Sequence, residues 1–311
     1  MLVTLKTLLT DANRRGYAVG AFNVTNLESV QAVIAAAENL KRPVIIQTTE
    51  KAISYAGLHT IRSLCMTAAM NAKVPVAFHM DHGKDLTLVK QCIDSGWTSV
   101  MFDGSALPYK ENLAKTKRVV AWARKRGVSV EAELGALKGK EDFVDIKEQE
   151  AFFTDPKQAV DFVTQTGIDA LAISVGTAHG PFKFSGDVHL DYKRIGTIKK
   201  LTKKPLVLHG ASGVPQEIVD ELHNHCDDLG DCARLSGSKG VPDSAIKKAI
   251  KNGINKINID SDLRIACLDG IRTSLLEKKE EYDPRVFLAA GRDKMTEVVM
   301  QKIKLFDVNK K

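Results

Sequence analysis

Short apolar runs alternate along the chain with longer segments in which apolar residues recur every three or four positions. Runs such as AFNV and PVIIQT are nearly continuous, which is typical of parallel strands buried on both faces. We expect eight such strands, at residues 19–24, 43–48, 74–80, 98–103, 128–133, 169–174, 205–209 and 254–260. The segments between them predict helices at 3–15, 28–40, 59–72, 86–95, 110–126, 191–202 and 261–276, and one more that opens at Asp155-Pro156.

Eight strands that alternate with helices predict a closed parallel α/β barrel, the (β/α)8 or TIM-barrel architecture. A doubly wound open sheet is the competing architecture, and it is less favoured because no GxGxxG opens a helix after the first strand. A chain of 311 residues accommodates one barrel of about 250 residues with extra terminal helices. We therefore expect one domain over residues 1–311, with a C-terminal helical extension at about 284–311.

Two segments depart from the strand and helix repeat. Residues 135–154 are charged, contain glycine and are too long for an ordinary connection, so they predict a lid over one end of the barrel. Residues 222–240 form an insertion between the seventh and eighth strands, with the composition of an exposed loop. The insertion contains side chains suited to a second metal site, which is the less favoured interpretation because no strand positions them: His223, His225, Cys226 and Cys232.

Composition narrows the class of protein. The hydrophobic content of 44% and charged content of 27% are those of a globular protein. The net charge of +7 comes from scattered basic residues apart from the tail at 309–311, so it favours attraction of anionic substrates over nucleic-acid binding. The 5 cysteines form no CxxC pair, and the N-terminus reaches charged residues within about ten positions. We expect reduced thiols, a cytoplasmic location and no association with membranes.

Three histidines stand in equivalent contexts. His82 in FHMDHG, His179 in SVGTAHG and His209 in LVLHG each close an apolar run, and each is followed by glycine. A single histidine at a strand end is more often a hydrogen-bonded structural residue, but chance does not repeat the context three times. Neutral imidazoles converging from three strands form the usual zinc site with one open position. Asp81, beside His82, also needs a partner because burying an unpaired carboxylate is costly.

Other polar residues fall at the same ends of the strands. The carboxyl ends of barrel strands form the active face, so residues from distant parts of the sequence are expected to meet there: Asn23, Thr49, Asp103, Glu133 and Asn258. The late loops TAHGPFK, HGASG and NIDSD present small residues, hydroxyl groups and a lysine that suit a phosphate: Gly180, Lys183, Gly210, Ser212 and Ser261. Beside a metal, these loops favour a phosphorylated carbonyl compound as substrate.

The motifs FHMDHG, VEAELG, GTAHG, LHGASG, KINIDSDLR and DPRVFLAAGRDKM together resemble the class II, metal-dependent fructose-bisphosphate aldolase family. The similarity extends from AFNV to KIKLF. It implies a lyase of glycolysis and gluconeogenesis that reversibly cleaves fructose 1,6-bisphosphate to dihydroxyacetone phosphate and glyceraldehyde 3-phosphate through a zinc-stabilised enediolate. It also implies one catalytic Zn²⁺ per subunit, a monovalent cation (Na⁺ or K⁺) near Gly180, and a homodimer or homotetramer.

The resemblance assigns the metal ligands to His82, His179 and His209, with Asp103 and Glu133 as carboxylates that catch the metal in an alternative position. It makes Asp81 the acid/base that works on the C4 hydroxyl of the substrate. Glu141 becomes the lid residue that exchanges a proton on the dihydroxyacetone phosphate carbon. Ala136 to Lys138 make this lid less glycine-rich than is usual in the family.

The remaining roles concern the substrate. The resemblance assigns one phosphate pocket to Gly180, Lys183, Gly210, Ser212, Asp260 and Ser261. Asn23 and Asn258 match residues that hold the intermediate, and Thr49 stands where serine is commoner. Arg285 matches an arginine that reaches the far phosphate in the neighbouring subunit, which implies at least a dimer.

Four alternatives remain. A tagatose-bisphosphate aldolase would share the metal site, but such members of the family tend to have alanine where Asp260 stands. A Schiff-base aldolase would need a desolvated lysine, and Lys256, in the eighth strand, has no obvious role. A zinc hydrolase on the same barrel usually carries an HxH pair in the first strand, which AFNV lacks. A non-catalytic scaffold is the least favoured, since every catalytic position of the family is filled.

Overall fold

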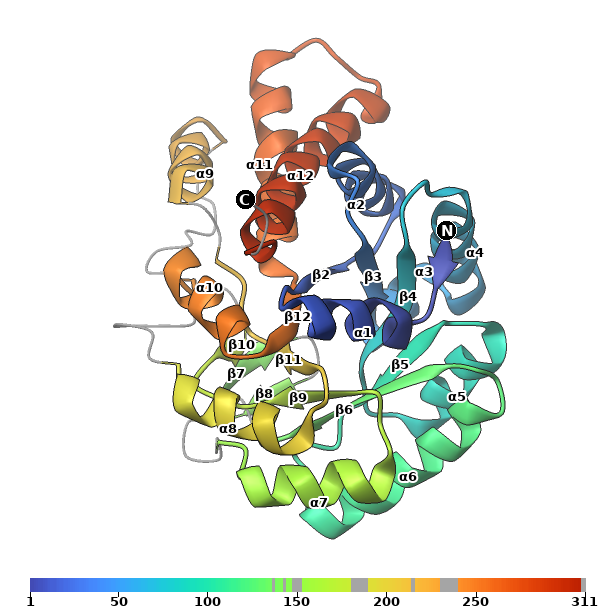
Figure 1. Cartoon of the computed structure of the whole chain (residues 1–311). Coiled ribbons are helices and arrows are strands. Elements are labelled where there is room, and N and C mark those ends of the chain that lie inside the picture. Colours follow the sequence, from blue (N-terminus) through green and yellow to red (C-terminus); the bar gives the residue numbers. More distant parts are fainter. Residues whose placement is uncertain are drawn as a thin grey trace.

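The computed structural model contains a closed barrel of eight parallel strands, which confirms the predicted (β/α)8 architecture (Figure 1). The structure describes residues 1–135, 138–141, 144–146, 153–179, 190–213, 216–229 and 240–308. The barrel strands are β2 (Val19–Asn23), β3 (Val44–Thr48), β4 (Val76–Gly83), β5 (Ser99–Phe102), β6 (Ser129–Leu134), β9 (Ala170–Ile173), β11 (Leu206–Leu208) and β12 (Ile254–Ile259). Each pairs with the next in this order, and pairing of β12 with β2 closes the ring.

Helices surround the barrel because each connects one parallel strand to the next. They are α2 (Leu27–Leu40), α3 (Glu50–Ala56), α4 (Leu58–Asn71), α5 (Leu86–Ser95), α6 (Tyr109–Arg124), α7 (Pro156–Thr166), α8 (Tyr192–Thr202), α9 (Gln216–Leu229) and α10 (Asp243–Lys251). After β12 the chain forms a helical hairpin, α11 (Ser261–Glu277) and α12 (Pro284–Phe306), and α12 packs against α2. The predicted C-terminal helical extension is therefore present in the described residues.

The amino-terminal end of the barrel is closed by α1 (Leu5–Arg15). Thr4 caps this helix by accepting a hydrogen bond from the Thr7 amide, and Gly16 ends it in the left-handed conformation. Leu5, Leu9 and the other buried residues of α1 pack against an apolar layer inside the barrel that includes Ala21, Ala77 and Ile45. Because apolar residues fill this end, polar chemistry is left to the opposite end.

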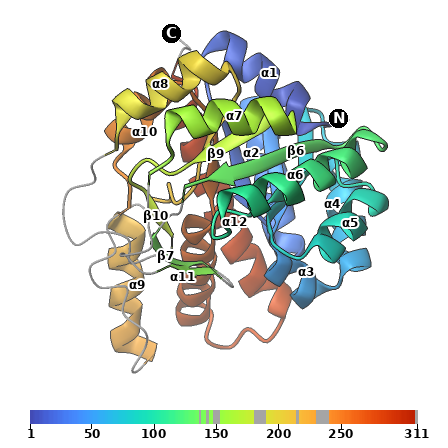
Figure 2. The ribbon, with the colours of Figure 1, turned by 90° about the horizontal axis from the view of Figure 1, so that it is seen from below.

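The opposite end contains the loops that follow the strands. Figure 2 shows α9, α11, β7 (Lys138–Glu141) and β10 (Ala178–His179) at the end away from α1. Together with β8 (Val144–Ile146), β7 and β10 form a separate three-stranded sheet. None of the described helices is long and apolar enough to cross a membrane.

Several details differ from the expectation, among them α10, which was not predicted. Residues 2–3 form a short strand, β1 (Leu2–Val3), which pairs with β4, so the leading helix starts later. A separate short helix, α3, follows β3. The 135–154 segment contains strands β7 and β8 as well as loop, and its residues 136–137, 142–143 and 147–152 lie outside the described part. Residues 222–229 are helical rather than loop, while 230–239 lie outside the described residues.

Candidate active site

A β-bulge at the end of β4 places two adjacent side chains at the mouth of the barrel. In a regular strand Asp81 and His82 would point to opposite faces of the sheet. Here His79 and Met80 pair with consecutive residues of β5, and the register then shifts before Gly83. His82 has a φ of 47°, a left-handed conformation that costs energy in a residue with a side chain. This bulge therefore turns His82 toward the same end of the barrel as Asp81.

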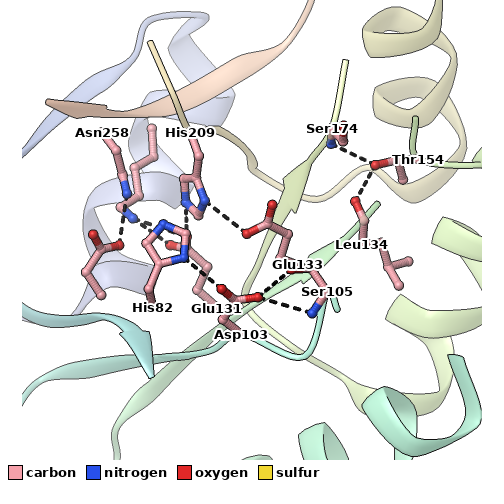
Figure 3. Close-up of polar contacts among 12 residues, drawn as sticks. His82, Asp103, Ser105, Glu131, Glu133, Leu134, Thr154, Ser174, His209 and Asn258 are labelled. Carbon is pink, nitrogen blue, oxygen red and sulfur yellow. Dashed lines mark hydrogen bonds and ion pairs between the residues drawn. The ribbon is translucent and has the colours of Figure 1, made fainter. Parts of the chain in front are cut away.

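The imidazole of His82 is oriented by a carboxylate from the next strand. Its Nδ1 atom lies 2.9 Å from Oδ2 of Asp103 (Figure 3). The other carboxylate oxygen of Asp103 accepts hydrogen bonds from the Ser105 amide at 3.1 Å and hydroxyl at 2.7 Å. Burial alone would raise the pKa of Asp103, but His82 and Ser105 outweigh it and hold that pKa well below its usual value.

His209, directly after β11, meets His82 across the mouth. The two ring centroids are 4.5 Å apart. His209 Nδ1 lies 3.1 Å from Glu133 Oε2, and its Nε2 lies 3.1 Å from Glu131 Oε1. Burial alone would lower the pKa of His209, but the Glu133 charge and the hydrogen bonds of both glutamates raise that pKa to about 9. The two glutamates therefore favour the protonated, positively charged form of His209.

The donor set at the mouth fits a divalent metal ion. Donor atoms of Asp81, His82 and His209 lie within 4.8 Å of one another, and so do those of His82, Asp103 and Glu133. All five side chains are buried. Imidazole nitrogens and carboxylate oxygens are the ligands that zinc and similar metals prefer. The two sets overlap, since His82 belongs to both.

Three amide side chains surround the Asp81 carboxylate, which is 1% exposed. Asn258 Nδ2 donates to Oδ1 at 2.9 Å, and Gln47 Nε2 donates to Oδ2 at 3.1 Å. Asn23 Nδ2 lies 3.4 Å from Oδ2, and Gln47 also donates to the Asn23 side-chain oxygen. The carboxylate is therefore fixed in orientation beside the candidate metal ligands. Asn23 and Asn258 were predicted as site residues, but Gln47, inside β3, was missed.

A fully buried ion pair lies beneath His209, deeper in the barrel. Lys256 Nζ is 2.9 Å and 3.1 Å from the two carboxylate oxygens of Glu131, and both residues have 0% exposure. Burial alone raises the pKa of Glu131, but Lys256 and His209 lower it well below its usual value. His79, also 0% exposed, contacts Ser99 at 2.9 Å, and burial together with Lys256 lowers its pKa. The expectation that Lys256 has no obvious role is wrong, because it neutralises Glu131.

The predicted phosphate residues of the last loops also gather at this end. Gly210 has a left-handed φ of 62°, and the Ser212 hydroxyl accepts a hydrogen bond from the Asp260 amide at 3.3 Å. Ser261 begins α11, so free amide groups of that helix face the same region. Arg264, missed from the sequence, binds both carboxylate oxygens of Asp260 at 2.8 Å.

A cavity of about 330 Å³ opens beside these loops, lined in part by Thr49, Lys51 and Arg264. The Thr49 hydroxyl caps α3 by accepting from the Ala52 amide at 3.2 Å. Arg264 is already paired with Asp260, and Lys51 adds a further basic side chain to the cavity, which suits an anionic group. Lys51 was not predicted because a lysine on a helix surface carries no sequence signal by itself.

For some of the predicted residues, the structure does not describe a side chain in the site. The backbone of His179 pairs with that of Gly139, two residues from Glu141, but the side chains of His179 and Glu141 lie outside the described residues. Gly180 and Lys183 lie outside them as well, as do the side chains of His225, Cys226 and Cys232. Arg285 is exposed on α12, where it pairs with Asp283 at 2.6 Å.

Comparison with known proteins gives one consistent result. The profile of the family described as "Fructose-bisphosphate aldolase class-II" matches residues 3–311. A fructose-bisphosphate aldolase of Giardia intestinalis is 43% identical over 308 residues, covering 98% of this chain and 93% of the relative. One from Thermus caldophilus is 42% identical over 306 residues, covering 98% of both. The crystal structure of the YdjI aldolase from Escherichia coli K12 superposes with a TM-score of 0.76 at 30% identity, covering 99% of this chain and 98% of that one.

Proposed function

The chain belongs to the class-II fructose-bisphosphate aldolase family, and from this premise we propose which of its residues carry out the reaction. The protein is a lyase that performs aldol cleavage. We propose that its substrate is fructose 1,6-bisphosphate and its products are dihydroxyacetone phosphate and glyceraldehyde 3-phosphate, in glycolysis and in the reverse direction in gluconeogenesis. The observation that carries this proposal is the fixed Asp81 carboxylate beside His82 and His209.

A divalent metal, which we propose to be zinc, would be held by His82, His179 and His209. Asp103 and Glu133 lie close enough to serve as alternative ligands. When bound, the metal supplies a positive charge that withdraws electrons from the ketone of the substrate. The chain's own contribution is to hold the imidazoles in place, through Asp103 for His82 and through either Glu133 or Glu131 for His209, whose other ring nitrogen would bind the metal.

Asp81 is proposed to accept the proton of the C4 hydroxyl as the C3–C4 bond breaks, which releases the aldehyde product. The amide groups of Asn258, Gln47 and Asn23 point their N–H groups at this carboxylate and so fix the direction from which it receives the proton. Glu141 is proposed to return a proton to the carbon of the remaining product. In the synthetic direction the same two groups act in the opposite sense.

Two anion subsites at the ends of the substrate would hold its reacting bond beside Asp81. We assign one phosphate to Ser212, Ser261 and the amide of Asp260, with Gly180, Lys183 and Gly210 completing the pocket and a monovalent cation near Gly180. We assign the other to the cavity lined by Thr49, Lys51 and Arg264. Arg285, exposed at the start of α12, is proposed to reach the neighbouring subunit's far phosphate in a homodimer or homotetramer.

The remaining expectations stand as proposals. One domain over the whole chain and a cytoplasmic location are supported by the continuous barrel and by the free thiols of Cys65, Cys92 and Cys267. A preference for fructose over the tagatose bisphosphate is supported by Asp260. The Schiff-base alternative is not supported, because the Lys256 amine pairs with Glu131 at 2.9 Å in a fully buried position.

The test is a paired assay of cleavage of fructose and tagatose 1,6-bisphosphates before and after treatment with a chelator. We expect the chelated enzyme to lose activity, zinc to restore it, and kcat/KM to favour the fructose isomer. Borohydride added together with substrate should leave activity intact, since no Schiff base forms. Activity that survives complete removal of the metal, together with inactivation by borohydride, would overturn the proposed mechanism. A higher kcat/KM for the tagatose isomer would overturn the substrate assignment alone.

A further inference from the structure

The loop after β11 is held from behind by a buried lysine of the C-terminal helix. Lys302, on α12, donates from Nζ to the Gly213 carbonyl at 2.6 Å, and this Nζ lies 3.3 Å from Oδ1 of Asp262. The same Asp262 oxygen accepts from the Gly213 amide at 3.1 Å. The pair of side chains therefore clamps both polar groups of one loop residue. Lys302 is 6% exposed and Asp262 is 0% exposed.

The rest of this loop has little room to move. The Ser212 carbonyl accepts from the Val241 amide at 3.3 Å. A Cβ added to Gly213 would lie 2.8 Å from the Val241 carbonyl oxygen, and one added to Gly240 would lie 2.1 Å from the Gly213 Cα. The Ser212 hydroxyl of this loop accepts a hydrogen bond from the Asp260 amide at 3.3 Å. Close packing and the clamp together fix where this hydroxyl and the nearby amide groups point.

A buried ion pair is a costly way to gain stability, because both charges must be removed from water. Its geometry here serves orientation instead, since each charge makes a hydrogen bond to the backbone of the same loop residue. Asp262 lies two residues after Asp260 and one after Ser261, which opens α11. The clamp thus ties the loop after β11 to the start of the helix after β12.

We propose that Lys302 is a positioning residue for substrate binding. Through Asp262 it holds the Ser212 and Gly213 loop in the geometry that receives a phosphate group, and the inference rests on the proposed assignment of this loop to the substrate. Lys302 itself does not touch the substrate. Its loss should therefore weaken binding of phosphorylated ligands more than it slows the chemical step.

The experiment compares Lys302→Met, which keeps most of the length of the side chain, with a double variant, Lys302→Met/Asp262→Asn, which leaves no uncompensated charge. Lys304→Met, at an exposed position two residues further along α12, is the matched control. Binding of dihydroxyacetone phosphate to each zinc-loaded protein is measured by calorimetry, and kcat and KM for fructose 1,6-bisphosphate are measured separately. Zinc content and urea unfolding are followed in parallel.

We expect Kd and KM to rise about ten- to hundredfold in Lys302→Met, the equivalent of one lost hydrogen bond to a charged group, with a smaller change in kcat. Zinc content should stay the same and Lys304→Met should resemble the wild type. The double variant should regain stability but keep the weakened binding, which also decides the question if the single variant does not fold. Unchanged Kd in either Lys302 variant would overturn the inference and leave the aldolase function intact. A wild-type protein that fails to bind dihydroxyacetone phosphate would overturn both.

Discussion

The Nδ1 atom of His82 lies 2.9 Å from Oδ2 of Asp103, and both side chains are buried at the mouth of the barrel. Because Ser105 fixes the other carboxylate oxygen through two hydrogen bonds, Asp103 cannot rotate freely. The bulge that turns His82 inward and the carboxylate that meets it come from neighbouring strands, β4 and β5. The two features together set the direction of the imidazole.

Replacing Asp103 should weaken metal binding. In Asp103→Ala the imidazole of His82 loses the carboxylate that orients it, and groups of this kind typically contribute about 10- to 100-fold to metal affinity. We expect the zinc dissociation constant to rise by that factor in competition with a fluorescent chelator. Asp94→Ala, at a partly exposed site on α5 where the aspartate pairs with Lys90, is the control. Equal zinc affinity of Asp103→Ala and wild type would contradict the role of Asp103.

Asp81→Asn should remove proton transfer without removing the metal. The substitution keeps the size of the side chain but cannot accept the C4 hydroxyl proton, and a positioned acid/base contributes about 10²- to 10⁴-fold to rate. We expect kcat for cleavage of fructose 1,6-bisphosphate to fall by that factor while zinc content, measured by atomic absorption, stays at the wild-type level. Retention of more than a tenth of wild-type kcat would assign the proton transfer to another group.

The buried pair of Lys256 and Glu131 should matter strongly for folding. Lys256→Met leaves the Glu131 carboxylate without its cation at 0% exposure, and breaking a buried pair costs about 3–5 kcal/mol. The double variant Lys256→Met/Glu131→Gln removes both charges and should recover most of the lost free energy of unfolding in urea. A single variant as stable as the wild type would mean that Glu131 is neutralised by another group, with His209 the nearest cation.

The hairpin of α11 and α12 depends on glycine where the two helices touch. A Cβ at Gly270 would lie 2.5 Å from the Ala290 carbonyl oxygen, so the backbones would have to separate. We expect Gly270→Ala to lower the free energy of unfolding by about 1–3 kcal/mol. Gly196→Ala is the matched control inside α8: its Cβ would meet nothing closer than 3.7 Å, so the change should be neutral or stabilise by up to about 1 kcal/mol. Equal stability of the two variants would contradict the close contact.

The barrel could be predicted from the sequence because its strands are continuous apolar runs that end in polar residues. The same rule placed Asp81, His82, Asp103, Glu133 and His209 at one end, where the structure brings them together. The bulge at His82 was not predictable, since nothing in HMDHG states which residue leaves the regular pairing. Elements of two and seven residues, β1 and α3, are too short to produce a recognisable period.

The polar layer beneath the site was missed for a different reason. A signal was present: Lys256 is the charged residue of β12, and the side chain of Glu131 lies on the same face of β6 as that of Glu133, two residues later. A charge in a strand buried on both faces requires a partner. The partner, however, lies across the barrel on a strand that is not a neighbour in the sheet, so only the closed ring brings Lys256 and Glu131 together.

Mixing two inactive variants tests whether Arg285 completes a neighbouring subunit's site. The Arg285 side chain is 88% exposed, and its ion pair with Asp283 is on the surface, where such pairs contribute little free energy. Packing within its own subunit therefore does not fix the position of this side chain. Subunits with Arg285→Ala lack the donated arginine but keep Asp81, and subunits with Asp81→Ala keep the arginine. After unfolding and refolding as a mixture, a hybrid dimer should contain one complete site, so up to about a quarter of wild-type activity should return. Arg292→Ala, further along the same helix, mixed with Asp81→Ala is the control. Recovery no greater than the sum of the separate variants would show that Arg285 serves no shared site.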